Sequence, residues 1–285
     1  MSELLKTSKE ICKMLEIKPS RSKGQNFLIT ERVYDDIVKA AKVSSDDLVL
    51  EVGPGLGFLT AKLAKVAKIV IAVELDDKLA AYLKMAIDSN DIENVHIVNE
   101  DVMKFDLDAY LTKLEVKTRK YKIVANLPYN ITSIFLRTFL SAKLKPESLT
   151  LMLQKEVAHR MISKAPDNNL LALSVAYYGE AEIVREVKAG NFWPEPDVDS
   201  SVIKVTLNDS KYDIELDRKF FRLAKMAFSS KRKMLRNNLS AGFKMKPVEI
   251  EAAMLKEGID PKRRAEDLSL EDFKKLFAAM SPFMV

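Results

Sequence analysis

The chain has 285 residues, with 46 lysines and arginines against 41 aspartates and glutamates, and its formal net charge at pH 7 is +5. This length predicts about two domains and is ample for a sizeable core. A single cysteine, Cys12, excludes an internal disulfide, and no apolar stretch approaches the ~20 residues of a membrane span. The first residues lack the apolar core of a secretory signal, so we expect a cytoplasmic protein.

Residues 1–20 are expected to form an N-terminal helical extension. Glu3 and Glu10 lie there among Lys6, Lys9 and Lys13 in an amphipathic pattern.

A glycine-rich turn follows the first predicted strand, residues 47–52, and leads into a predicted helix over residues 58–64. Gly53, Gly55 and Gly57 would let the backbone approach a ligand and direct amides toward it, which suits a nucleotide-like cofactor. The G-x-G-x-G spacing lacks the lysine of a phosphate loop, so phosphate is not the favoured ligand. A plain strand-to-helix connection is the alternative interpretation.

Acidic residues end the next two predicted strands. The strand over residues 69–73 runs into Glu74, where a carboxylate can bind both hydroxyls of a ribose. The strand over residues 95–98 leads to Asp101, which could accept a hydrogen bond from an adenine amine. Either acid alone could instead be a helix cap or a solvated loop residue.

The tetrapeptide Asn126, Leu127, Pro128 and Tyr129 follows the fourth predicted strand, residues 121–125. It is suited to hold a planar exocyclic amine, because the Asn126 side chain and the Leu127 carbonyl offer acceptors and Tyr129 offers a stacking face. Pro128 fixes the turn and biases Leu127 away from helix. A strand that ends in a proline turn is the alternative.

These features fall at the carboxyl ends of successive strands, where open parallel sheets bind ligands. A cofactor with adenine and ribose but no required phosphate, combined with an amine acceptor, indicates S-adenosylmethionine. The predicted fold is α/β, a Rossmann-like S-adenosylmethionine-dependent methyltransferase sheet with a small all-helical C-terminal domain. A composition shift near residues 208–210 divides a methyltransferase domain, residues 21–208, from a helical RNA- or ribosome-contacting domain, residues 209–285.

The remaining predicted elements are mostly helical. Helices are expected over residues 134–140, 154–162, 170–178, 220–228, 231–239, 248–256 and 270–280, and strands over residues 149–153, 181–187 and 201–207, the last two as an antiparallel pair. His96 and His159 have no partners at metal spacing, so no metal site is expected.

Two further features concern RNA. Phe192 and Trp193 lie in a proline-stiffened loop, where exposed aromatics suit stacking on an unpaired base; a hydrophobic plug between the domains is the alternative. Trp193 is expected to be such a plug. A basic cluster without a nearby acid in the sequence favours phosphate contact, although such a run is usually a solvated face. The cluster consists of Lys231, Arg232, Lys233 and Arg236.

The sequence resembles the ribosomal RNA adenine dimethyltransferases that modify small-subunit RNA. The matching segments are residues 21–28, 51–60, 126–131, 192–200, 231–239 and 264–269, together with Phe273. The chain departs from the family pattern at Glu195 and Thr30, which puts loop rigidity in doubt and not activity. The resemblance implies a seven-stranded sheet whose last two strands are antiparallel.

The resemblance also implies residue roles. Asn126, Leu127, Pro128, Tyr129 and Phe192 would form the catalytic site, with Tyr129 and Phe192 clamping the adenine. The cofactor would contact Gln25, Asn26, Leu28, Gly53, Gly55, Glu74, Asp101 and Asn126.

The implied activity is dimethylation of two adjacent adenosines in a 3′-terminal hairpin of small-subunit ribosomal RNA. The partner would be a small-subunit precursor during ribosome biogenesis, and the chain would act as a monomer. A resistance-type methyltransferase of large-subunit RNA is one alternative, disfavoured by Leu127 and by residues 231–239. A non-catalytic RNA-binding assembly factor is the other, disfavoured by the intact Gly53, Glu74, Asp101 and Asn126.

Overall fold

The computed structural model describes residues 2–19, 25–129, 131–208 and 213–284. It divides into two compact units, one of residues 1–158 with 180–208 and one of residues 159–179 with 209–285. The domain boundaries predicted after residues 20 and 208 fall at segments outside the described residues, as do residues 21–24 and Asn130 of the family motifs. The structure assigns residues 159–179 to the helical unit, whereas the sequence analysis included them in the first domain.

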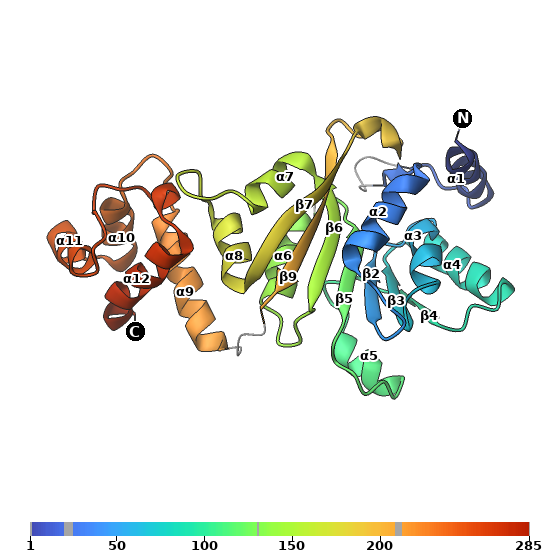
Figure 1. Cartoon of the computed structure of the whole chain (residues 1–285), viewed down its shortest axis with the longest axis horizontal. Coiled ribbons are helices and arrows are strands. Elements are labelled where there is room, and N and C mark those ends of the chain that lie inside the picture. The colour runs from blue at the N-terminus through green and yellow to red at the C-terminus, as the bar shows by residue number, and fades with distance from the viewer. Residues whose placement is uncertain (1, 20–24, 130, 209–212, 285) are drawn as a thin grey trace. The chain divides into compact units, whose positions relative to one another are not determined.

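The first unit is built on a seven-stranded sheet with the order β4-β3-β2-β5-β6-β9-β7 (Figure 1). Neighbours from β4 to β6 are parallel, and β9 is antiparallel to β6. The strands are β2 (Leu48–Val52), β3 (Ile69–Glu74), β4 (Val95–Asn99), β5 (Lys122–Asn126), β6 (Ser148–Gln154), β7 (Gly179–Val187) and β9 (Ser200–Leu207). The predicted α/β class and seven-stranded sheet are therefore confirmed.

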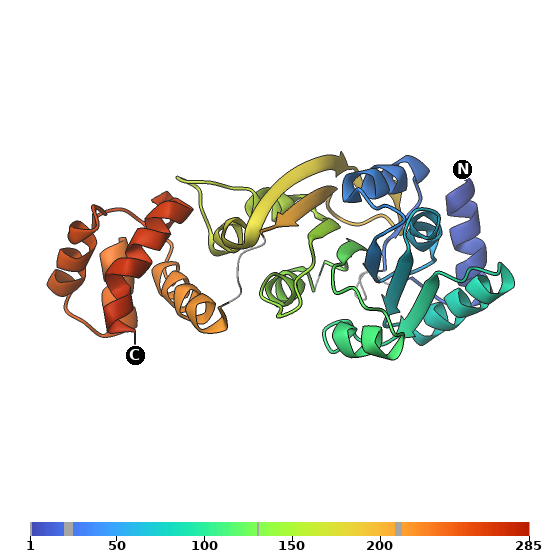
Figure 2. The same cartoon turned by 60° about the horizontal axis from the view of Figure 1, so that its bottom comes forward.

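Helices cover both faces of this sheet, with α2 on one face and α6 on the other (Figures 1 and 2). Successive side chains of a strand point to opposite faces. Val49, Val70 and Val124 accordingly share a core with α2 and α3. The helices are α1 (Glu3–Met14), α2 (Glu31–Ala41), α3 (Phe58–Ala64), α4 (Asp77–Ser89), α5 (Leu107–Lys113), α6 (Thr132–Leu140) and α7 (Lys155–Met161).

A short antiparallel ribbon lies outside the main sheet, formed by β1 (Phe27–Leu28) and β8 (Phe192–Trp193). Leu28 pairs with Phe192, and both side chains join the core under α2. The prediction of exposed aromatics is wrong for Phe192, which is only 3% exposed. Trp193 is partly buried against a cluster that contains Cys12 and Phe27, within the first unit, so it is no plug between domains.

The second unit is helical and has its own core, which includes Phe220, Leu239 and Phe273. Its helices are α8 (Leu170–Tyr178), α9 (Ile214–Ala227), α10 (Leu235–Phe243), α11 (Pro247–Lys256) and α12 (Leu270–Met280). The buried Asn168 donates its Nδ2 to the Leu268 carbonyl at 2.8 Å, which ties the segment before α8 to the C-terminal helices. The predicted helix over residues 231–239 begins later, at Leu235.

Candidate active site

The glycine turn after β2 uses its amides inside the protein. Gly53 donates to the Val73 carbonyl, Gly55 to Glu74 Oε2 and Gly57 to the Pro54 carbonyl, each at 3.0 Å. The expectation that these amides point at a ligand is therefore wrong. What the glycines supply is conformation, since their φ angles of 64°, 60° and 83° are left-handed. A Cβ atom on Gly53 would meet nothing within 4 Å, so the backbone is uncovered at that point.

Glu74 lies at the carboxyl end of β3 and is 7% exposed. Its two oxygens accept backbone hydrogen bonds, Oε2 from Gly55 at 3.0 Å and Oε1 from Asp76 at 2.9 Å. Burial raises the pKa of this carboxyl, and the two backbone hydrogen bonds act in the opposite direction. Each carboxylate oxygen can accept more than one hydrogen bond, so the side chain keeps capacity for a ligand's hydroxyls.

Glu51 is a second acid beside Glu74, and the sequence analysis assigned it no role. It lies within β2 and is 1% exposed. Neither carboxylate oxygen has a hydrogen-bond partner among the described residues. Burial raises the pKa of Glu51 to about 8, and the negative charge of Glu74 raises it further. The nearby Thr60 hydroxyl lowers this pKa, although it does not reach hydrogen-bond geometry. A charged residue in the apolar run Leu48–Val52, directly before Gly53, was the signal that could have revealed this acid.

Asn26 repeats this pattern, because its Oδ1 atom is also buried without a partner among the described residues. The neighbouring Gln25 donates its Nε2 to Asp76 Oδ2 at 3.4 Å. Leu28 is fully buried in the core, and its carbonyl accepts a hydrogen bond from the Tyr34 hydroxyl at 2.9 Å. The Leu28 side chain thus supports the core under the site.

Asp101 follows β4 and caps a turn, with its Oδ1 atom accepting from the Met103 amide at 2.9 Å. The Glu100 amide donates to the Glu74 carbonyl at 3.1 Å, so the ends of β3 and β4 are tied together. Among the described residues no hydrogen bond reaches Asp101 Oδ2, and this oxygen can accept one from a ligand.

The turn after β5 is anchored at both ends. The Leu127 amide donates to the Met152 carbonyl at 3.0 Å, and the Tyr129 hydroxyl bonds Ser200 Oγ at 2.8 Å. Burial raises the pKa of Tyr129, and the Ser200 hydroxyl opposes that shift. Within the described part of the chain, the Asn126 side chain and the Leu127 carbonyl make no hydrogen bond.

The strand order brings most predicted cofactor residues to one edge. β2, β3, β4 and β5 are neighbours, and their carboxyl ends carry Gly53, Glu74, Asp101 and Asn126 in that chain order. Register pairs Val52 with both Val73 and Ala125, so these ends lie level with one another. This fold with this ligand edge is that of an S-adenosylmethionine-dependent methyltransferase.

The predicted RNA-binding cluster lies in the second unit, and two of its four cations lie beside acidic residues. Lys231 Nζ lies 3.8 Å from Glu266 Oε2, and Arg236 forms an ion pair with Glu251. Acids that are distant in sequence therefore lie beside two of the four cations in the folded unit, which the local sequence did not reveal. Lys233 and Arg232 are exposed, and neither has an ion pair with a described residue.

Known proteins with similar sequences and structures identify the family of the chain. A model of the ribosomal RNA adenine dimethylase family matches residues 17–281. Ribosomal RNA small subunit methyltransferase A of Dehalococcoides mccartyi is 42% identical over 276 residues, which cover 96% of this chain and 92% of the relative. A dimethyladenosine transferase from Plasmodium falciparum has a similar crystal structure, with a TM-score of 0.74 and 25% identity over 90% of this chain and 98% of that one.

A second solved structure, the 23S rRNA methyltransferase ErmE, shares the fold, with a TM-score of 0.70 and 24% identity. The match covers 90% of this chain and 100% of ErmE. The chain belongs to the ribosomal RNA adenine dimethylase family. The predicted enzyme class and cofactor, an rRNA adenine dimethyltransferase that uses S-adenosylmethionine, are thereby confirmed.

The described residues contain neither a metal-binding group nor a membrane-spanning helix. No group of three or more His, Cys, Asp or Glu side chains that could hold a metal ion occurs among them. No helix within the same residues is long and apolar enough to cross a membrane.

Proposed function

We propose that the chain transfers methyl groups to the exocyclic amines of two adjacent adenosines in a 3′-terminal hairpin of small-subunit ribosomal RNA. The substrate would be a small-subunit precursor in the cytoplasm, and the chain would act as a monomer. The observation that carries the proposal is the turn after β5, where Asn126 and the Leu127 carbonyl keep open acceptors beside the anchored Tyr129. The similarity to small-subunit methyltransferase A over 96% of the chain supports the choice of RNA.

The residues at the strand ends fit the proposed cofactor. When bound, S-adenosylmethionine supplies a methyl group from a positively charged sulfur, and its methionine end carries an ammonium. Buried acceptors without partners, Asn26 Oδ1 and the Glu51 carboxylate, suit such cationic groups. Gln25 precedes Asn26 in the chain and donates to Asp76, and Gly53, whose Cβ position is open, would leave room along this end of the ligand. A Cβ on Gly55 would instead meet the Phe27 ring, so Gly55 would act through its hydrogen bond to Glu74.

The acids at the ends of β3 and β4 would bind the nucleoside part. Glu74, already held by Gly55 and Asp76, would accept from the ribose hydroxyls with its remaining lone pairs. The free Oδ2 atom of Asp101 would accept from the cofactor's adenine amine. The backbone hydrogen bonds fix the Glu74 rotamer before the ligand arrives, which reduces the entropy cost of binding.

The target amine would be oriented by two acceptors. Asn126 Oδ1 and the Leu127 carbonyl would each take one amine hydrogen, so that the nitrogen lone pair points at the methyl carbon for direct displacement. No strong general base is required, because the amine proton becomes acidic once the nitrogen is methylated. Pro128 holds the turn, and Tyr129 would stack on the adenine from its fixed position.

Phe192 would act differently from Tyr129. Its ring belongs to the core and pairs with Leu28 across the short ribbon, so it would hold β1, with Asn26 next to it, in place. Stacking of Phe192 on a base would require the ring to leave that core. The stacking face for the adenine would therefore be the ring of Tyr129.

Tritiated-methyl transfer to unmethylated small subunits, compared with large subunits and followed by nucleoside analysis, tests the function. Dimethyladenosine in small-subunit RNA alone is the expected result. Label in large-subunit RNA would favour the ErmE-like alternative, which the shared fold keeps open. Cofactor binding measured by calorimetry separates both enzymes from a non-catalytic assembly factor, which would bind RNA without binding S-adenosylmethionine.

A further inference from the structure

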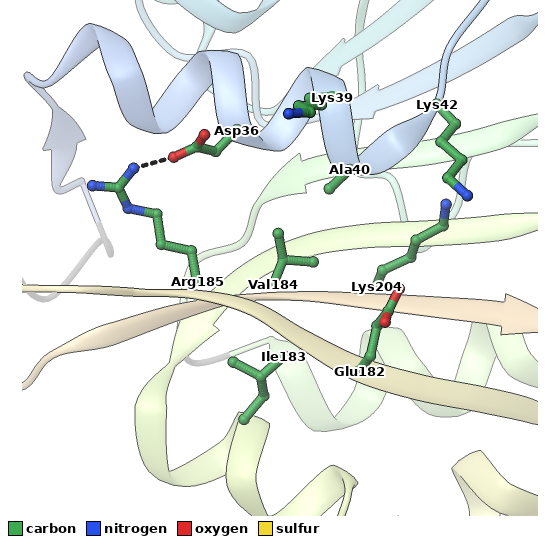
Figure 3. A pocket seen from close by; sticks show the side chains of 9 residues that line it. All are labelled: Asp36, Lys39, Ala40, Lys42, Glu182, Ile183, Val184, Arg185 and Lys204. Atoms are coloured by element: carbon green, nitrogen blue, oxygen red, sulfur yellow. Dashed lines mark hydrogen bonds and ion pairs between the residues drawn. The ribbon is translucent and has the colours of Figure 1, made fainter.

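A groove separate from the ligand edge lies in the first unit between α2 and the strands β7 and β9 (Figure 3). It encloses a cavity of about 620 Å³. Four cationic and two acidic side chains line it: Lys39, Lys42, Arg185, Lys204, Asp36 and Glu182. None of these residues has a role in the proposed methyl transfer.

Cations outnumber acids around the groove, and only one of the two lining acids is in an ion pair with a described residue. Asp36 pairs with Arg185 (Figure 3), and the nearby Lys122 is held by Asp47 at 2.8 Å. In the described chain, Lys39 and Lys42 form no ion pair and their ammonium groups donate no hydrogen bond. The groove therefore keeps positive charge that the protein itself does not neutralise.

Lys204 is the unusual member of this set. It lies in β9 between the apolar residues Ile203 and Val205, and is only 9% exposed. Its ammonium has no hydrogen bond or ion pair with any described residue, and it extends toward the Lys42 ammonium (Figure 3). Burial lowers the pKa of Lys204, and the charges of Lys42 and Lys122 lower it further, while Glu182 opposes them.

An ammonium on a mostly buried side chain, without a partner and close to a second cation, costs stability unless a ligand of opposite charge compensates it. Two lysines that face each other from different elements form a pair of donors for one compact anion with several oxygens. We propose that the groove is a phosphate-binding site in which Lys204 and Lys42 bind the oxygens of one phosphate group. The phosphate could belong to an RNA backbone or to a free ligand, and the two sources are separable by experiment.

The first arm uses inorganic phosphate and the full chain with ¹³C-labelled lysine side chains. Phosphate, titrated against chloride at constant ionic strength, should shift the Lys204 and Lys42 signals together in a saturable way. Lys204→Met should remove the shift at Lys42, whereas Lys84→Met on α4, which removes one exposed charge elsewhere, should leave it intact. Because the methionine replaces a cation that has no partner and faces Lys42, the melting temperature of Lys204→Met should not fall.

The second arm uses small-subunit RNA and rests on the proposed function. If the phosphate is that of the RNA backbone, Lys204→Met and Lys42→Gln should each lower the slope of log affinity against log salt by about one unit, with Lys84→Met as control. Shifts with inorganic phosphate combined with an unchanged RNA slope would assign the site to a free phosphate-bearing ligand. If phosphate causes no shifts and the variants do not change the slope, the proposed phosphate site is refuted. Methyl transfer measured on the same samples reports separately on the proposed function.

Discussion

The buried acid Glu51 gives the sharpest prediction about stability. Its pKa is raised from 4.5 to about 8, so between these values the folded chain holds a proton that the unfolded chain has lost. The free energy of unfolding should therefore fall as pH rises from about 4.5 to about 8, and then level off. A pKa difference of one between the folded and unfolded chain corresponds to about 1.4 kcal/mol, so the loss is on the order of 4 to 5 kcal/mol.

Glu51→Gln removes this titration and keeps the shape of the side chain. We expect the variant to resemble the wild-type chain near pH 4.5 and to exceed it in stability by a few kcal/mol near pH 8. Urea unfolding at a series of pH values measures both curves, and their difference isolates Glu51 from the other titrating groups. Parallel curves from pH 4.5 to 8 would show that Glu51 is not buried and neutral as described.

The same acid predicts a proton linked to cofactor binding. A cationic ligand beside Glu51 favours its charged form and lowers its pKa. Binding of S-adenosylmethionine near pH 7 should therefore release protons, which calorimetry in buffers of different ionisation enthalpy can count. Glu51→Gln should release fewer. Equal release by both chains would place the cofactor's positive groups away from Glu51.

Three further predictions concern the proposed residue roles. Glu74→Ala should weaken cofactor binding in calorimetry by ~1 to 3 kcal/mol, because a buried ribose loses a charged acceptor; unchanged affinity would contradict the ribose assignment. Asn126→Ala should depress the turnover number far more than cofactor affinity, since it orients the amine in the transition state; the reverse pattern would remove that role. Replacing Arg232 and Lys233, which are not paired to acids in the described structure, with glutamine should flatten the salt dependence of RNA binding by up to about two units without affecting the cofactor, and a wild-type slope would mark this face as merely solvated.

Much of the sheet could be predicted because the central strands are short, mostly apolar runs that end at a glycine turn or at a polar residue. Because β2, β3 and β5 are buried along nearly their whole length, the apolar runs before Gly53, Glu74 and Asn126 predict strands correctly. The spacing of Val33, Ile37 and Ala41 is also typical of an amphipathic helix, but α2 was not among the predicted helices.

Other features depend on contacts between distant segments, which sequence patterns do not report. The two-residue strands of the ribbon are too short to show a period, and their pairing joins Phe27 to Trp193 across most of the first unit. The burial of Phe192 follows from that pairing. In the same way Glu251 and Glu266 neutralise Arg236 and Lys231 only after the second unit has folded.

The balance of open donors and acceptors separates the two binding sites of the first unit. At the ligand edge the amides of Gly53, Gly55 and Gly57 donate within the protein, while the acceptors of Asn26, Glu51 and Asn126 find no partner among the described residues. A site with open acceptors selects a ligand that brings hydrogens and positive charge, such as an amine or an ammonium, and disfavours phosphate. In the groove the open groups are donors, since Lys204 and Lys42 lack partners there, so the same reasoning selects an anion. The two sites should therefore bind independently, and saturating the chain with S-adenosylmethionine should leave the phosphate-induced shift of Lys204 unchanged.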